Sequence, residues 1–222
     1  MADWIAETFR SDTGWDHLET LVDIGNRMAG QPGEMEGLEA TRDAFAAAGA
    51  RDARVETFDL AGWVRGDSSI ATPETVEDSI ALPRGPAGEV DAELIDLGAG
   101  LPADFEEHDV EGKIVLATSD VPEYFDRYIH RTEKYQYAVE GGAAAFIYAN
   151  HVPGELPPTG SVGGSDGGPY GDIPAVGVSA ETGARLARRF DGDEVTVAVE
   201  CETPETESGN AVAELGPDTE EV

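Results

Sequence analysis

The histidines are the residues best suited to metal or acid–base chemistry, and their spacing favours neither. They are His17, His108, His130 and His151, and no two of them form a His-x-His or His-x-x-x-His pair. A catalytic zinc site needs three protein ligands, usually histidine and carboxylate. Acidic neighbours such as Asp16 and Asp109 are expected by chance among 46 Asp and Glu residues. We therefore predict surface histidines and no metal or other cofactor site within this sequence.

A serine nucleophile is the second candidate. Gly163–Gly167 matches Gly-x-Ser-x-Gly around Ser165, a motif that in hydrolases stands on a tight turn between a strand and a helix. Here glycine- and proline-rich sequence flanks the motif, and no histidine follows His151 to complete the triad. The same glycines lack the Gly-Lys-Ser/Thr ending of a phosphate-binding loop. We therefore predict a glycine-rich loop over Pro153–Asp172 and no catalytic residue in this chain.

An aromatic and basic segment supplies the candidate binding residues. Tyr128, His130 and Arg131 fall within a run of tyrosines, in a chain with 14 Lys and Arg against 46 Asp and Glu. Tyrosines at helical spacing most often pack in a core, and a ligand-facing role is the alternative for these three residues. Arg27 and Tyr170 lie in two glycine-containing loops and are further candidates for substrate binding, since loops on a rigid scaffold often carry binding.

The elements that would position these residues begin with a helical zone, residues 1–60. We predict a helix at Trp15–Ile24, a loop at Asn26–Gly33, a second helix at Glu34–Ala48 and a strand at Arg54–Leu60. The helices show apolar residues at helical spacing and end at glycine, and the strand alternates apolar and polar residues.

The middle zone, residues 61–203, is richer in strands. Strands are predicted at Ser68–Ile70, Ile80–Leu82, Glu89–Leu97, Lys113–Thr118, Ala144–Tyr148, Ile173–Val178 and Glu194–Cys201, and helices at Tyr124–Glu140 and Ala180–Phe190. Ser179 is a suitable N-cap for the second helix. The continuous apolar strands on either side of the first helix form a βαβ unit and predict an α/β fold. A nucleotide-binding domain would share this unit, but that interpretation rests on fold analogy alone.

The last zone, residues 204–222, is short. We predict an acidic linker at Pro204–Gly209, a strand at Asn210–Leu215 and a turn at Gly216–Glu221. The strand has no local partner, and the sequence stops at Val222 where another element would begin. We therefore expect a fragment of a longer protein.

The net charge of −32 excludes whole classes of partner. Nucleic acid and anionic membranes both need positive charge, so neither is expected. The acids are dispersed through a chain that is 40% hydrophobic, which predicts a folded protein and not a disordered one. Molar salt reduces the Debye length to about 3 Å and screens such self-repulsion, so we predict a halophilic protein. An acidic protein of ordinary cytoplasm is the alternative.

The termini and the single cysteine bear on location. Cys201 is the one cysteine, so neither an internal disulfide nor a cysteine-based metal site is expected. The N-terminus lacks the basic and apolar regions of a secretory signal, and no apolar run approaches the length of a membrane span. A cytoplasmic location, in a high-salt cytoplasm, is the simplest expectation. A homo-oligomer is compatible with the sequence.

Three segments in the middle zone resemble those of a known family. They are Val110–Leu116 with its Gly-Lys-Ile strand, Ala138–Tyr148 with its glycine junction between helix and strand, and Ile173–Ser179 with its Ile-Pro strand before a helix. In this order and at these spacings they resemble a protease-associated (PA) domain. The resemblance implies a mixed β-sandwich or barrel with peripheral helices, over residues 61–203.

The flanks resemble the start of a di-zinc aminopeptidase domain of the glutamate-carboxypeptidase-like family. The similar segments are Gly25–Gly30 with the helix after it, and Ser208–Leu215. The resemblance implies that Arg54–Leu60 pairs with Asn210–Leu215 on the N-terminal helices, as a small portion of the peptidase domain. It also implies that the first zinc-ligand histidine, and both zinc ions of the full-length parent, lie beyond Val222.

The function implied is that of a non-catalytic part of a zinc metallo-aminopeptidase, a hydrolase that removes N-terminal residues of peptides. The PA domain would border the active-site cleft and help to admit or position peptide substrates, and the remainder of the peptidase domain would be its partner. On this interpretation the glycine loop Gly160–Gly171 and the loop Asn26–Gly30 would face the cleft. A free-standing PA-type interaction module without enzyme activity is the alternative.

Overall fold

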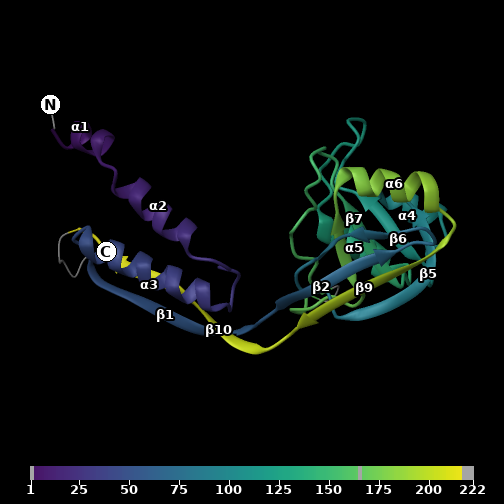
Figure 1. Cartoon of the computed structure of the whole chain (residues 1–222). Coiled ribbons are helices and arrows are strands. Elements are labelled where there is room, and N and C mark those ends of the chain that lie inside the picture. The colour runs from purple at the N-terminus through teal and green to yellow at the C-terminus, as the bar shows by residue number, and fades with distance from the viewer. Residues whose placement is uncertain (1–2, 165–166, 217–222) are drawn as a thin grey trace. The chain divides into compact units, whose positions relative to one another are not determined.

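Two separate units make up the chain. In the computed structural model, unit 1 comprises Met1–Gly62 and Thr203–Val222, and unit 2 comprises Trp63–Glu202 (Figure 1). The structure describes residues 3–164 and 167–216. The Ser165 motif centre and most of the predicted turn Gly216–Glu221 therefore lie outside the described residues.

Unit 1 is built from helices and one ribbon. Its elements are α1 (Asp3–Arg10), α2 (Thr13–Asp23), α3 (Pro32–Ala47), β1 (Arg51–Ala61) and β10 (Glu205–Glu214). The two strands pair antiparallel, with Arg54 opposite Val212 and Ala61 opposite Glu205. Helix α3 packs on both strands, and α2 packs on α3. The predicted pairing of Arg54–Leu60 with Asn210–Leu215 is confirmed for residues 54–56, which pair with residues 210–212, whereas residues 57–60 pair with residues 206–209. Helix α1 is one that the sequence prediction missed.

The predicted linker Pro204–Gly209 is wrong, because β10 already begins at Glu205. The charges in this segment obscure a strand alternation. Ser208 is buried and Thr206 half-buried, whereas Glu205 and Glu207 are exposed. The inward pair explains the strand: Thr206 donates to Gly30 O at 3.1 Å and Ser208 donates to Glu34 Oε1 at 2.8 Å.

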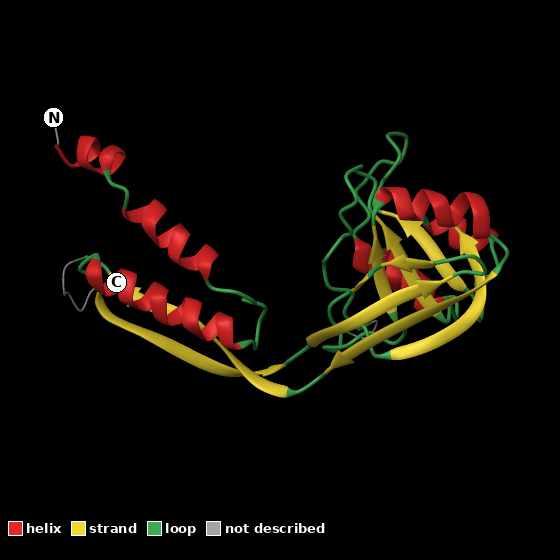
Figure 2. Cartoon of the chain, in the orientation of Figure 1, coloured by secondary structure: helices red, strands yellow, loops and turns green. Residues whose placement is uncertain are grey.

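Unit 2 contains one mixed sheet with the order β3-β2-β9-β5-β6-β7-β8-β4. The strands are β2 (Val64–Ala71), β3 (Val76–Asp78), β4 (Ile80–Ala81), β5 (Gly88–Asp96), β6 (Ile114–Thr118), β7 (Ala145–Ala149), β8 (Ala175–Val178) and β9 (Glu194–Glu202). The helices are α4 (Pro102–Glu107), α5 (Arg131–Glu140) and α6 (Ala180–Phe190). Strands β5 to β8 are parallel, and the other pairings are antiparallel. The mixed α/β fold with peripheral helices is thus confirmed (Figure 2).

The two faces of the parallel strands serve different helices. Val115, Phe146 and Tyr148 join a core cluster with Tyr135 and Ala138 of α5. Alternate residues point the other way, since side chains alternate along a strand, and α6 packs on β5, β6 and β7 on that side. Ser179 caps α6 by accepting from Thr182 N at 3.1 Å, as predicted.

The predicted helix over Tyr124–Glu140 is wrong in its first half, because α5 starts only at Arg131. His130 stands at the N-cap position, where its side chain accepts from Thr132 N at 3.3 Å. The segment before it forms turns, and the buried Ile129 fixes its last residues to the unit. The strand β3 and the helix α4 are short elements that the sequence prediction also missed.

Candidate functional site

A cluster of aromatic and basic side chains stands where β6 and β7 end. We call Tyr128, His130, Arg131 and Tyr148 the Arg131 cluster. The rings of Tyr128 and His130 meet edge to face, with centroids 6.3 Å apart. Arg131 begins α5, and its Nε donates to Ser161 O at 2.7 Å. A side chain at Gly160 would overlap the guanidinium, so this glycine lets the loop lie directly against Arg131.

Burial shapes the electrostatics of this cluster. Burial lowers the pKa of the Arg131 guanidinium, an effect that Tyr148 and Tyr128 oppose. Burial also raises the pKa of Tyr148 to about 12; Tyr128 adds to the shift and Arg131 opposes it. Both shifts have the same origin, since a low-dielectric site disfavours the charged form. The cluster therefore offers a half-buried guanidinium beside neutral phenols, an arrangement suited to a carboxylate or a peptide carbonyl.

The segment before Arg131 is held by a second set of contacts. Arg127 pairs with Glu133 through two nitrogens, one of them 2.8 Å from Oε2, and Tyr137 donates to Glu133 Oε1 at 2.6 Å. Hydrogen bonds donated by Arg127 and, as the second largest effect, by Tyr137 lower the pKa of Glu133 to about 2. Glu133 thus remains ionised and fixes the segment that carries Tyr128.

Lys134 is a buried cation that sequence reasoning missed. It is fully buried, and Nζ donates to Thr118 O at 2.8 Å and to Asp120 O at 2.9 Å. Burial lowers its pKa to about 8, although Asp120 and Asp104 oppose the shift. Its rarity was the available signal, because the sequence has 14 Lys and Arg in all and Lys113 is the other lysine. Lys134 fixes the end of β6 against α5, and its Nζ lies 6.0 Å from the ring centroid of Tyr148 in the Arg131 cluster.

The glycine-rich loop is anchored at several points. The backbone carbonyl of Arg84 accepts from Gly171 N at 2.6 Å, and the side chain of Arg84 donates to Pro169 O at 3.0 Å. The Tyr135 hydroxyl donates to Ile173 O at 2.8 Å and accepts from Ile173 N at 2.9 Å. Tyr170 lies half-buried between these anchors. It belongs to unit 2, as the Arg131 cluster does.

Arg27 lies in unit 1, in the loop between α2 and α3. Glu34 organises this loop by accepting from Gly30 N at 2.6 Å and from Ser208 Oγ at 2.8 Å. Gly33 is required at the start of α3, because a side chain there would overlap the carbonyl oxygen of Gly25. The structure therefore brings Tyr128, His130 and Arg131 together, whereas Arg27 belongs to the other unit.

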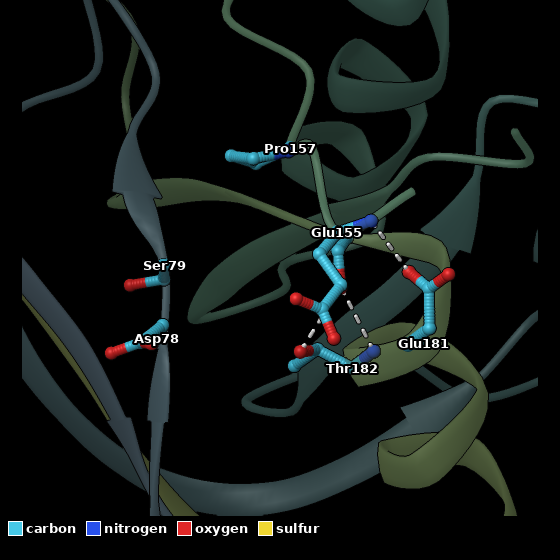
Figure 3. A pocket seen from close by; sticks show the side chains of 7 residues that line it. Asp78, Ser79, Glu155, Pro157, Glu181 and Thr182 are labelled. Atoms are coloured by element: carbon cyan, nitrogen blue, oxygen red, sulfur yellow. Dashed lines mark hydrogen bonds between the residues drawn. The ribbon is translucent and has the colours of Figure 1, made fainter. Parts of the chain in front are cut away.

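An acidic hollow of about 270 Å³ lies beside the start of α6. Asp78 and Ser79 stand on one wall, and Glu155, Glu181 and Thr182 stand on the other (Figure 3). Glu181 accepts from Gly154 N at 2.9 Å and from Glu155 N at 3.1 Å, and these bonds lower its pKa. The hollow can therefore receive a cationic or hydrogen-bonding group.

The described part of the chain has no group of three His, Cys, Asp or Glu side chains that could hold a metal ion. The residues present do not fit a zinc centre, so no hydrolytic step is assigned to them. Among residues 3–164 and 167–216, no helix has the length and apolarity to cross a membrane.

Comparisons with known proteins agree with this fold. Residues 85–186 match the family model of the PA domain. An aminopeptidase from Aneurinibacillus sp. strain AM-1 is similar, with 26% identity, a TM-score of 0.67, and coverage of 95% of this chain and 49% of that chain. A zinc aminopeptidase from Bacillus subtilis is 23% identical with a TM-score of 0.70, covering 95% of this chain and 48% of that chain.

A third structure, a peptidase M28 precursor from Shewanella amazonensis SB2B, is 19% identical with a TM-score of 0.68, covering 92% of this chain and 50% of that chain. No curated protein sequence matches the chain. The chain spans about half the length of the solved chains it resembles. It therefore carries a PA domain, within a fold similar to part of the zinc aminopeptidases.

Proposed function

We propose that this chain is the non-catalytic, PA-bearing part of a zinc aminopeptidase, whose remaining peptidase domain covers unit 1. The observation that carries the proposal is the exposure of apolar side chains in unit 1. Phe9 is 90% exposed, Trp15 63% and Val22 65%. Isolated surface hydrophobics are ordinary, but a concentration of them marks an interaction surface.

The interior of unit 1 supports the same proposal. Among its described residues, no hydrophobic side chain is buried; Gly33, Gly37, Gly62 and Ser208 are its buried positions. Its sheet has two strands, and such a ribbon is marginal in water unless further strands or packing extend it. This chain covers about half of each aminopeptidase chain that it resembles. A polypeptide similar to the uncovered half, the rest of the peptidase domain, would be a partner of suitable size.

In this proposal unit 2 borders the active-site cleft and assists peptide substrates. Arg131 is the residue best suited to a contact, because its half-buried guanidinium lies between a fixed loop and two phenols. Tyr128 and His130 flank it, and Tyr170 and Arg27 stay candidates on their loops. The two zinc ions of the parent would be bound by residues outside this chain and would supply the activated water for hydrolysis.

The test compares two polypeptides. The 222-residue chain and a chain extended by the downstream coding sequence are assayed with zinc and an aminoacyl p-nitroanilide. We expect hydrolysis by the extended chain, abolished by a chelator, and none by the 222-residue chain. Metal-dependent hydrolysis by the 222-residue chain would refute the non-catalytic assignment.

A salt-adapted setting belongs to the same proposal. The net charge of −32 would be tolerated best in a high-salt cytoplasm, where self-repulsion is screened.

The alternative is a free-standing interaction module. The observation in its favour is that unit 2 contains its own buried core, from Trp63 to Val199. The sequence of the gene beyond Val222 discriminates between the two. A stretch resembling Gly-His-x-Asp within a few codons supports the peptidase, and a stop codon supports the module.

A further inference from the structure

A groove of about 460 Å³ lies between α6 and the carboxyl ends of β5, β6 and β7. Its floor includes Leu116 and Ala149, its helix side Ala184 and Ala187, and its rim Asp96 and His151. Crevices at the carboxyl ends of parallel strands are the usual ligand sites of α/β sheets. The volume is in the range of peptide-sized and drug-sized pockets.

Residue size along α6 explains why the groove is open. Gly183 packs directly on Ala149, because any side chain at Gly183 would overlap it. This contact brings the helix onto β7. Toward β5 and β6 the helix presents Ala180, Ala184 and Ala187, at the spacing of one helix face. These side chains are too short to fill the space, so the groove stays open along the alanine face of the helix, whereas Leu116 and Ala149 at its base are themselves buried.

Polar groups of fixed orientation stand at the mouth of the groove. Ser119 Oγ accepts from His151 N at 2.9 Å and lies 2.7 Å from His151 Nδ1. The serine hydroxyl can donate to Nδ1, and in the tautomer that accepts this bond His151 carries an N–H on Nε2 that can donate to a ligand. Asp96 Oδ1 accepts from Gly98 N at 2.9 Å, which fixes the carboxylate at the rim.

Charge distinguishes the kind of occupant. No Lys or Arg lines the groove, and Glu181 lines both the groove and the acidic hollow of Figure 3. Two arginines of α6 are paired with other acids, Arg185 with Glu77 at 3.1 Å and Arg189 with Glu74 at 2.7 Å, and Arg188 is exposed but does not line the groove. No salt bridge among the described residues neutralises Asp78, Glu155 or Glu181, so the two adjoining hollows complement a cation.

We propose that this surface binds an extended peptide segment that carries an apolar side chain next to a basic one. The apolar side chain occupies the groove against Ala184 and Ala187, and the basic side chain reaches the hollow at Glu181. A peptide carbonyl accepts from His151 at the mouth. The proposal concerns unit 2 alone and does not require that the chain be part of a peptidase.

The test is a calorimetric titration of the 222-residue chain with acetylated, amidated tetrapeptides. Leu-Lys-Leu-Lys should bind, whereas Leu-Glu-Leu-Glu should not and Ser-Lys-Ser-Lys should bind at least tenfold more weakly. Ala184→Phe fills the groove and should weaken Leu-Lys-Leu-Lys at least tenfold. Ala46→Phe, an equivalent change on exposed α3, should leave the affinity unchanged. Asp96→Asn should weaken binding several-fold, and Asp67→Asn, at an exposed position of β2, should not.

Each titration is repeated at 0.5 M and 2 M salt, because nonspecific attraction to an acidic surface is screened at the higher concentration. Circular dichroism checks that each variant folds, and Ala187→Leu replaces Ala184→Phe if the latter does not. Absence of binding up to millimolar peptide, equal binding of Ser-Lys-Ser-Lys, or equal affinities for Ala184→Phe and Ala46→Phe would each overturn the proposal.

Discussion

Unit 1 and unit 2 contain helices packed on strands, yet their interiors differ. In the described part of the chain every buried hydrophobic side chain lies between Trp63 and Val199, within unit 2. Unit 1 instead exposes Phe9, Trp15 and Val22. Burial of a large apolar side chain is worth about 1.5–3 kcal/mol, so a unit without such burial has little to offset its conformational entropy. The difference suggests that unit 2 folds by itself and that unit 1 needs a partner.

Separating the units gives the largest expected effect. Residues 63–202 expressed alone should unfold in one cooperative thermal transition. Residues 1–62 joined to residues 203–222 should show no cooperative transition, because the joined piece lacks a core. Gly62 and Pro204 are already hydrogen bonded, N to O at 2.8 Å, so the join is short. Circular dichroism checks both pieces, and a sharp transition in the unit 1 piece would break the comparison.

A matched pair of phenylalanines tests the same contrast within the intact chain. Phe146 is fully buried in unit 2, whereas Phe9 is 90% exposed in unit 1. Phe146→Ala should lower the free energy of unfolding by about 3–5 kcal/mol, as for other buried phenylalanines. Phe9→Ala should change it by less than about 0.5 kcal/mol. Chemical denaturation measures both, and similar losses for the two variants would contradict the account.

Salt should stabilise the chain, since the net charge of −32 makes it repel itself. Between about 0.1 M and 3 M salt we expect the melting temperature to rise by more than about 5 °C, through screening. Differential scanning calorimetry at fixed pH measures the shift, with an uncharged osmolyte at matched osmolarity as control. A midpoint independent of salt would remove the halophilic interpretation.

Lys134 should produce a smaller, pH-dependent effect. Its folded pKa of about 8 lies below that of an unfolded lysine, so the unfolded chain binds the extra proton. Unfolding free energy should therefore rise by about 1 kcal/mol between about pH 8 and 9.5, below the range in which tyrosines ionise. Lys134→Met should abolish this slope while lowering stability, because it leaves two carbonyls without their donor. Denaturation at several pH values, at constant salt, measures the slope; an equal slope in the variant would exclude Lys134 as its source.

The strongly patterned parts of the fold could be predicted from the sequence. Strands β6 and β7 are continuous apolar runs, and Ser179 before α6 is a good cap, so both features stand in local sequence. The start of α5 could not be predicted from the tyrosine spacing, because it depends on His130 capping Thr132 N. The start of β10 could not be predicted either. Acidic residues alternate there with Thr206 and Ser208, and the sequence does not show that these two side chains point inward to bond unit 1.

The candidate site could be predicted only in part. Arg131 stands out in an acidic sequence, and its neighbours Tyr128 and His130 follow from proximity along the chain. Tyr148 reads as a strand residue, and the burial of Lys134 depends on carbonyls of Thr118 and Asp120 that the fold brings to it. The groove beside α6 depends on the packing of Gly183 on Ala149, which no local pattern reveals.

Amide hydrogen exchange on the 222-residue chain tests the contrast between the units most directly. The account predicts strong protection along β6 and β7, and exchange close to the unprotected rate along α1 and α2, since local stability follows buried contacts. Under the proposed function, a polypeptide that supplies the rest of the peptidase domain should slow exchange in α1 and α2 while leaving β6 and β7 unchanged. Protection of α1 and α2 in the 222-residue chain as strong as that of β6 and β7 would contradict the account.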